Sequence, residues 1–155
     1  MQQLQVGYGK VKTTPEFSVG LAGYSDEATR KSTGVLSDIY ITCIAATEGE
    51  ETVLLYTVDM CGLYEEDWDM FREAIYGTLG IPRNRIFIGT THTHTAPGIN
   101  EEADGRKYIG LILGKAIVAA QAALADRAPA AIESASGEIE GMNFVRHYLM
   151  KDGTY

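Results

Sequence analysis

A nearly continuous apolar run, Val53-Leu54-Leu55-Tyr56, most constrains what this chain can fold into. Such a run, bounded by polar turn residues, is typical of a strand inside a sheet, and we expect residues 52–59 to form one that is covered on both faces. The preceding residues 35–47 are rich in β-branched side chains and predict a second strand. Because only the polar residues 48–51 separate the two runs, they should pair as an antiparallel hairpin.

Residues 4–11 predict a further strand, in which Gly7 and Gly9 mark either a bulge or a place where another backbone approaches closely. The following residues 16–34 are rich in glycine and polar side chains, which indicates an irregular loop. Loops of this length in a compact domain are often functional.

Two segments have the apolar spacing of helices that pack on a sheet. The first starts with the acidic residues 65–67 and ends at Gly80. Four of its side chains lie on one apolar face: Trp68, Phe71, Ile75 and Leu79. The second, residues 106–126, is rich in alanine, which favours a helix and allows close packing.

Three more runs read as strands, at residues 85–91, 130–136 and 138–148. Strands alternating with helices in this order predict one α/β domain, a mixed sheet with helices packed against it. Its central sheet should include residues 35–47, 52–59 and 85–91.

The chain has 155 residues and a formal net charge of −8, without a run of Lys and Arg. Nucleic acid is therefore not an expected partner. Cys43 and Cys61 both lie in apolar surroundings without metal-ligand spacing, so we expect two buried free thiols. We expect no transmembrane segment. The first residues do not resemble a signal peptide, which predicts a cytoplasmic protein, or a secreted or periplasmic one if the N-terminus was trimmed.

Two of the three histidines follow the run at 85–91 closely, in the sequence Thr91-His92-Thr93-His94. If the strand continued through Thr93, side chains at i and i+2 would leave the same face, and both imidazoles would meet. Small threonines leave room for a metal, a water or a substrate, so the pair is a candidate zinc half-site. The alternative is that both rings only hydrogen-bond nearby backbone. Asp59 and His147 are further candidate ligands, although no spacing links them to this pair.

The sequence around the histidines, Thr91-His92-Thr93-His94 followed by Thr-Ala-Pro-Gly, resembles the signature Thr-His-Thr-His-Ser-Gly-Pro of the neutral/alkaline ceramidase family. The resemblance continues in chain order along most of the sequence, in the segments Val6-Gly7-Tyr8-Gly9-Lys10-Val11, Leu21-Ala22-Gly23-Tyr24, Val58-Asp59-Met60, Asn84-Arg85-Ile86 and Asn143-Phe144-Val145-Arg146.

This resemblance implies a zinc-dependent hydrolase that cleaves the amide bond of an N-acyl sphingosine, a related N-acyl lipid or another small amide. It implies that His92 binds zinc, and that His94 and Arg146 line the active site as catalytic residues. In the family an Asn-Arg pair supplies the arginine, whereas Val145 precedes Arg146 here. The alternative that Arg146 is a surface strand residue therefore stays open.

The family's remaining zinc ligands, a second histidine, a glutamate and a tyrosine, and its serine come from segments further along the chain than Tyr155. The resemblance therefore implies that residues 1–155 form a truncated N-terminal part of the catalytic domain, inactive alone and unable to hold zinc tightly. Two alternatives stay open: another metal-dependent amidohydrolase, and a non-catalytic binding or assembly domain that retains the motif.

Overall fold

The computed structural model describes residues 3–24, 29–99, 103–142 and 147–154. Within these ranges the chain forms one mixed sheet with the strand order β4-β3-β2-β1-β5. The elements in chain order are β1 (Gln5–Lys12), β2 (Tyr40–Glu48), β3 (Glu51–Val58), α1 (Glu65–Leu79), the short 3-10 helix η1 (Arg83–Arg85), β4 (Ile86–Thr90), α2 (Ala103–Ala125) and β5 (Ala128–Pro129). This confirms the predicted α/β class.

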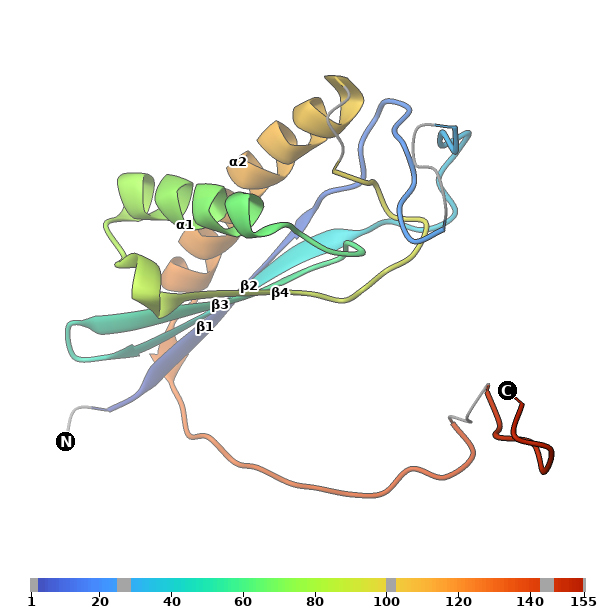
Figure 1. Cartoon of the computed structure of the whole chain (residues 1–155). Helices are drawn as coiled ribbons and strands as arrows, with labels where there is room; N and C mark the ends of the chain where they lie inside the picture. The colour runs from blue at the N-terminus through green and yellow to red at the C-terminus, as the bar shows by residue number, and fades with distance from the viewer. Residues whose placement is uncertain (1–2, 25–28, 100–102, 143–146, 155) are drawn as a thin grey trace.

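Strands β2 and β3 pair as the expected antiparallel hairpin, and β1 pairs antiparallel to β2. Strand β4 lies parallel to β3, because α1 carries the chain back across the sheet between them. Parallel neighbours end at the same edge of a sheet, so the residues that follow β3 and β4 emerge together. Both helices lie on the same face of the sheet (Figure 1).

Strand β2 begins at Tyr40, five residues later than predicted, and this part of the prediction was wrong. Its neighbour β1 ends at Lys12, so no ladder exists for residues 35–39 to join beyond the bond from the Thr13 N–H to the Ile39 carbonyl. Val35 and Leu36 are exposed instead. High β-propensity does not form a strand where a neighbouring strand is missing.

Helix α2 packs on β1 at two glycines. A β-carbon at Gly7 would lie 2.0 Å from the carbonyl oxygen of Ala123, and one at Gly9 would lie 2.1 Å from that of Ala119. Gly7 and Gly9 are thus close-approach positions, the second of the two predicted readings. The alanine-rich face of the helix is buried as expected and includes Tyr108, Ile112, Ala116, Ala119 and Ala123.

Helix α2 is long and apolar enough, by length and composition, to cross a membrane. Its apolar residues have another explanation here, because its inner face joins the core formed by β2, β3 and α1. A buried core helix meets the same criterion as a membrane span.

The face of the sheet opposite the helices carries an apolar row that the described residues leave exposed. Tyr8, Ile44, Leu55 and Phe87 are register neighbours on four successive strands and are 51, 39, 43 and 55% exposed. The prediction that β3 is covered on both faces was therefore wrong for this part of the chain. Its inward residues, Leu54 and Val58, are completely buried.

The two strands predicted after residue 129 are absent from the described residues. Only β5 forms, pairing with Gln5 and Val6, and the chain then leaves the sheet as an extended segment (Figure 1). Its apolar side chains, among them Ile132 and Ile139, are exposed. Alternating hydrophobicity favours a strand but does not provide the neighbour that a strand needs. Residues 143–146 lie outside the described ranges.

The glycine contact gives a prediction for stability. Gly9→Ala places a methyl group against the backbone of α2, and we expect it to lower the free energy of unfolding by about 3 kcal/mol or more. Gly89→Ala in β4 is the matched control, because its β-carbon would meet nothing closer than 3.9 Å. Urea denaturation of both variants checks this; equal stabilities would show that α2 can move away from β1 at little cost.

Candidate functional site

The histidine segment continues beyond β4 as an irregular ribbon beside the residues that follow β3. The N–H of Thr91 donates to the carbonyl of Val58 at 3.0 Å, and that of Thr93 donates to the carbonyl of Met60 at 3.0 Å. The strand itself ends at Thr90, and His92 has a φ of +57°. The condition set for the pair, an extended strand through Thr93, is therefore not met, because His92 turns into the left-handed region.

On its other side the ribbon is bound to the loop after β1. The N–H of Thr95 donates to the carbonyl of Ala22, and the N–H of Ala22 donates to the carbonyl of Ala96, both at 2.9 Å. Thr95 has a φ of +66°, a conformation that a β-branched residue rarely adopts. The segment is thus held between two neighbours, and this fixes its strained backbone.

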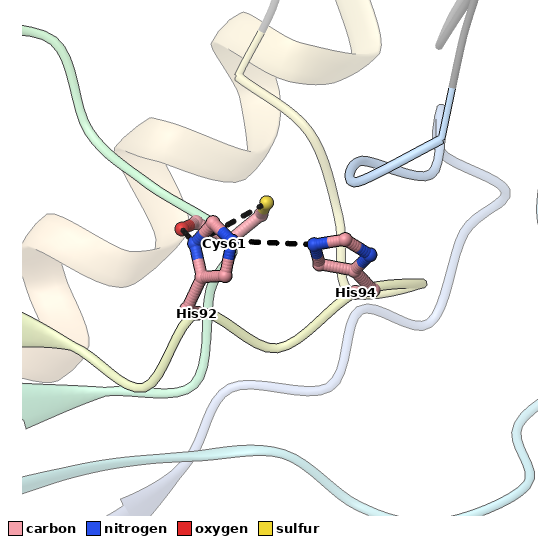
Figure 2. A group of neighbouring side chains, drawn as sticks. All are labelled: Cys61, His92 and His94. Atoms are coloured by element: carbon pink, nitrogen blue, oxygen red, sulfur yellow. Dashed lines mark hydrogen bonds between the residues drawn. The ribbon is translucent and has the colours of Figure 1, made fainter. Parts of the chain in front are cut away.

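The two imidazoles face each other across this turn (Figure 2). Nε2 of His94 lies 3.3 Å from Nε2 of His92, and the ring centroids are 4.9 Å apart. Nδ1 of His92 lies 2.7 Å from the carbonyl oxygen of Cys61. Since a carbonyl oxygen only accepts, Nδ1 carries the proton, and the Nε2 of a neutral His92 ring presents its lone pair toward His94.

The side chain of Cys61 completes a group that the sequence did not indicate. Its Sγ lies 3.9 Å from Nδ1 of His92, and the candidate ligand atoms of Cys61, His92 and His94 all lie within 4.8 Å of one another. The prediction of a buried free thiol is confirmed for Cys43 and wrong for Cys61, which is half-buried. The order of the elements could have indicated this neighbour, because Cys61 follows β3, His92 follows β4, and these two strands are parallel.

This donor set fits a zinc ion. In a tetrahedral site with zinc–nitrogen bonds of about 2.0–2.1 Å, two ligand nitrogens stand roughly 3.4 Å apart, and the two Nε2 atoms are 3.3 Å apart. A histidine that ligates through one nitrogen usually donates its other N–H to a carbonyl or carboxylate, as His92 does to Cys61. Both rings are exposed, so the position between them is open to solvent.

His94 is held in place by the loop after β1. Gly23 adopts a φ of +94°, and a β-carbon there would lie 2.4 Å from Cγ of His94. The ring of Tyr24 meets the His94 ring edge-on at a centroid distance of 4.9 Å, and the guanidinium of Arg30 lies over the Tyr24 ring. Gly23 thus provides the space that the imidazole occupies.

Two hollows of about 240 Å³ flank the histidine pair. His94 lines the first, whose other walls are largely apolar and include Leu21, Val35 and Leu36. His92 and Cys61 line the second. The exposed residues before β2 thus form part of a wall beside the site.

The other predicted candidates do not join the pair. Asp59 accepts a hydrogen bond from the Tyr40 N–H at 2.9 Å and another from the Thr91 hydroxyl at 3.2 Å, so its carboxylate holds the strand ends. His147 is exposed in the C-terminal segment and is not part of the Cys61 group. Arg146 lies outside the described residues, and its role stays a prediction.

Asp104 in the first turn of α2 anchors the loop that carries Gly23. Its carboxylate accepts hydrogen bonds from Lys31 Nζ at 2.8 Å and from the Gly20 N–H at 3.1 Å. The bond from Lys31, with smaller contributions from the N–H groups of Gly20 and Gly105, lowers the pKa of Asp104 below its usual 3.8, although partial burial opposes this.

No family model matches the chain, and no curated protein matches it in sequence. Solved structures of similar fold include neutral ceramidase from Pseudomonas aeruginosa, with a TM-score of 0.71 at 19% identity. A ceramidase complexed with C2 matches with a TM-score of 0.71 at 20% identity. Each match covers 83% of this chain but only 22% of the solved chain, so these residues have the fold of part of a larger protein.

The packing at Gly23 predicts the effect of a single methyl group. Gly23→Ala combines a positive φ with a contact against the His94 ring, so we expect a stability loss of more than about 1 kcal/mol and displacement of His94. Imidazole ¹⁵N spectra should lose the signature of the His92–His94 hydrogen bond. Gly34→Ala in the same loop is the control, since its β-carbon would meet nothing within 4 Å. Unchanged spectra in Gly23→Ala would refute this packing role.

The ion pair between Asp104 and Lys31 predicts that the stability of the fold depends on pH. Because the folded pKa of Asp104 lies below its unfolded value, its carboxylate stabilises the fold above the unfolded pKa, and this contribution is lost as the pH falls through the folded pKa. Asp104→Asn should lower the free energy of unfolding at pH 7 by up to about 1 kcal/mol, because Lys31 is partly exposed. The difference from wild type should shrink in acid; a constant difference would contradict the ion pair. Exposed Asp69→Asn serves as control.

Proposed function

We propose that this chain forms part of a zinc-dependent hydrolase similar to neutral ceramidase, which cleaves the amide bond of an N-acyl sphingosine or a related N-acyl lipid. The observation that carries the proposal is the pair of Nε2 atoms, 3.3 Å apart, at an open edge of a fold shared with solved ceramidases. The fold likeness supports a hydrolase of this type. The Thr-His-Thr-His sequence supports the proposal that residues 91–94 belong to its active site.

His92 is the proposed zinc ligand of this chain. Its Nδ1–H is committed to the Cys61 carbonyl, which orients the ring and leaves Nε2 to bind a cation. When bound, zinc supplies a water of lowered pKa and polarises the carbonyl that is attacked. Hydrogen bonds to the residues that follow β3 fix the strained backbone at His92, and this keeps its Nε2 in position for the role.

His94 is the proposed proton-handling residue. Its Nε2 lies beside the His92 nitrogen, and its ring lines the apolar hollow, so it faces the metal position and the substrate side together. In that place it can accept or return a proton at Nε2, or donate a hydrogen bond to a developing oxyanion. Arg146 is proposed to line the same site by family resemblance.

The hollow beside His94 supports an apolar substrate. Its walls include Val19, Leu21, Val35 and Leu36, and its volume of about 240 Å³ is below the range of a complete small-molecule pocket, roughly 300–1,000 Å³. It would therefore hold part of an acyl chain, with the rest of the groove formed elsewhere.

The chain spans 22% of the length of the solved ceramidases, so the activity of the whole protein is itself a proposal. We propose that catalysis requires further segments that add zinc ligands and the remaining site residues, and that the 155-residue chain alone is not an amidase. The exposure of both histidine rings in this chain supports this division.

The test uses the protein from the complete reading frame that contains this chain, with a fluorogenic N-acyl sphingosine. We expect turnover that a chelator abolishes and zinc restores. His92→Ala should remove activity together with metal, and His94→Ala should lower kcat by about 10²- to 10⁴-fold when measured at saturating zinc.

Three outcomes would contradict the proposal. Metal-independent turnover would remove zinc from the mechanism. Bound zinc without hydrolysis of any N-acyl amide would favour the alternative of a non-catalytic binding or assembly domain. Loss of activity in His147→Ala with retention in His92→Ala would show that the ligands had been assigned to the wrong histidines.

A further inference from the structure

We infer that the Cys61 thiolate is a third protein ligand beside His92 and His94, so that this chain alone forms a Cys-His-His site for a thiophilic divalent ion. The inference rests on the metal-binding part of the proposed function and is independent of amide hydrolysis. It concerns the 155-residue chain and replaces the expectation from family resemblance that these residues hold only one ligand and release zinc readily. In the complete protein, where further segments are proposed to add zinc ligands, His94 keeps the proposed proton-handling role.

The geometry that carries the inference comes from three loop residues at one edge of the sheet. The ligand atoms of Cys61, His92 and His94 all lie within 4.8 Å of one another (Figure 2). In a tetrahedral zinc site a sulfur and a nitrogen ligand stand roughly 3.6 Å apart. The donors therefore have to approach one another by about 1 Å at most to bind one ion, a shift that side-chain rotation can supply.

The backbone already fixes the relative positions of these donors. Cys61 follows Met60, whose carbonyl accepts the Thr93 N–H and whose N–H donates to the Val58 carbonyl at 2.9 Å. The Cys61 carbonyl itself binds His92 Nδ1. The sulfur and both imidazoles are thus attached to one hydrogen-bonded ribbon, which reduces the ordering that metal binding must otherwise supply.

The donor set determines which ions suit the site. One thiolate with two imidazoles favours zinc, cobalt(II) or cadmium over magnesium and calcium, which prefer oxygen ligands. On binding, the S–H bond breaks, the proton passes to solvent and a sulfur lone pair forms the bond to the metal, with no electron transfer. Three protein ligands leave a fourth position open, as in catalytic zinc sites.

Cys43 provides a matched control within the same chain. It is the other cysteine, lies in β2 on the helix-covered face, and is completely buried. Burial raises the pKa of the Cys43 thiol to about 12, so it stays protonated and away from solvent metal. His147 is the corresponding control for the histidines, because it is exposed and is not part of the group.

The experiment titrates the purified 155-residue chain, reduced and metal-free, with cobalt(II) and then with zinc. We expect one equivalent of cobalt to give a near-ultraviolet sulfur-to-metal charge-transfer band, and zinc to displace it. Cys61→Ser should lose the band and weaken zinc binding at least tenfold, whereas Cys43→Ser and His147→Ala should keep both. His92→Ala and His94→Ala should each weaken binding as well.

A second measurement uses the wild-type chain and so does not depend on a variant folding. Zinc should protect Cys61 from alkylation by iodoacetamide, with mass mapping to distinguish it from Cys43. One bound zinc without a cobalt–sulfur band and without protection of Cys61 would overturn the inference and leave a histidine-only site. A Cys61 site in a chain whose complete protein lacks amidase activity would instead refute the proposed function alone.

Discussion

The close approach of helix α2 to strand β1 is the contact on which the rest of the structure depends. The carbonyl oxygens of Ala119 and Ala123 occupy the space that a β-carbon at position 9 or 7 would need, so only glycine fits at Gly9 and Gly7. This contact sets the height of the helix above the sheet and so the position of its first turn. There Asp104 binds the backbone of Gly20, and the same loop packs against His94. Two glycines in a strand thereby help to place a side chain that lies far from them in sequence.

The site owes its shape to strain in a short segment. In an extended strand, residues at i and i+2 lie about 6.6 Å apart along the chain and their rings stand side by side. The left-handed conformations of His92 and Thr95 turn the backbone instead, and the two Nε2 atoms come within 3.3 Å. Each such residue costs roughly 1–3 kcal/mol, which the hydrogen bonds on both sides of the ribbon must offset.

Much of the fold could be predicted because local patterns determined it. The polar turn at 48–51 specified the β2–β3 hairpin, and the face shared by Phe71 and Ile75 specified α1. Residues 130–136 show where such reasoning fails, since a strand needs a neighbour that the pattern does not supply. The exposed side of Leu55 has the same origin: a run of apolar residues does not reveal whether a second layer covers it.

The candidate site was predictable in part and for an incomplete reason. The i, i+2 spacing predicted that His92 and His94 lie together because both side chains would leave one face of an extended strand. In the structure, a turn of the backbone at His92 brings them together instead. Cys61 escaped notice because it is distant in sequence and has no ligand spacing to either histidine. Only the parallel pairing of β3 and β4, which depends on the crossover through α1, makes Cys61 their neighbour.

The wide sequence separation of the contacts around the histidines has a consequence for folding. The β2–β3 hairpin closes a four-residue turn region, but the bonds from Thr95 and Gly98 to the loop at 20–22 join segments more than 70 residues apart. Loop closure of that length is costly until the sheet and α2 have assembled. We therefore expect the amides of the histidine ribbon to exchange with solvent well before those of the hairpin, so that the site forms late and opens early.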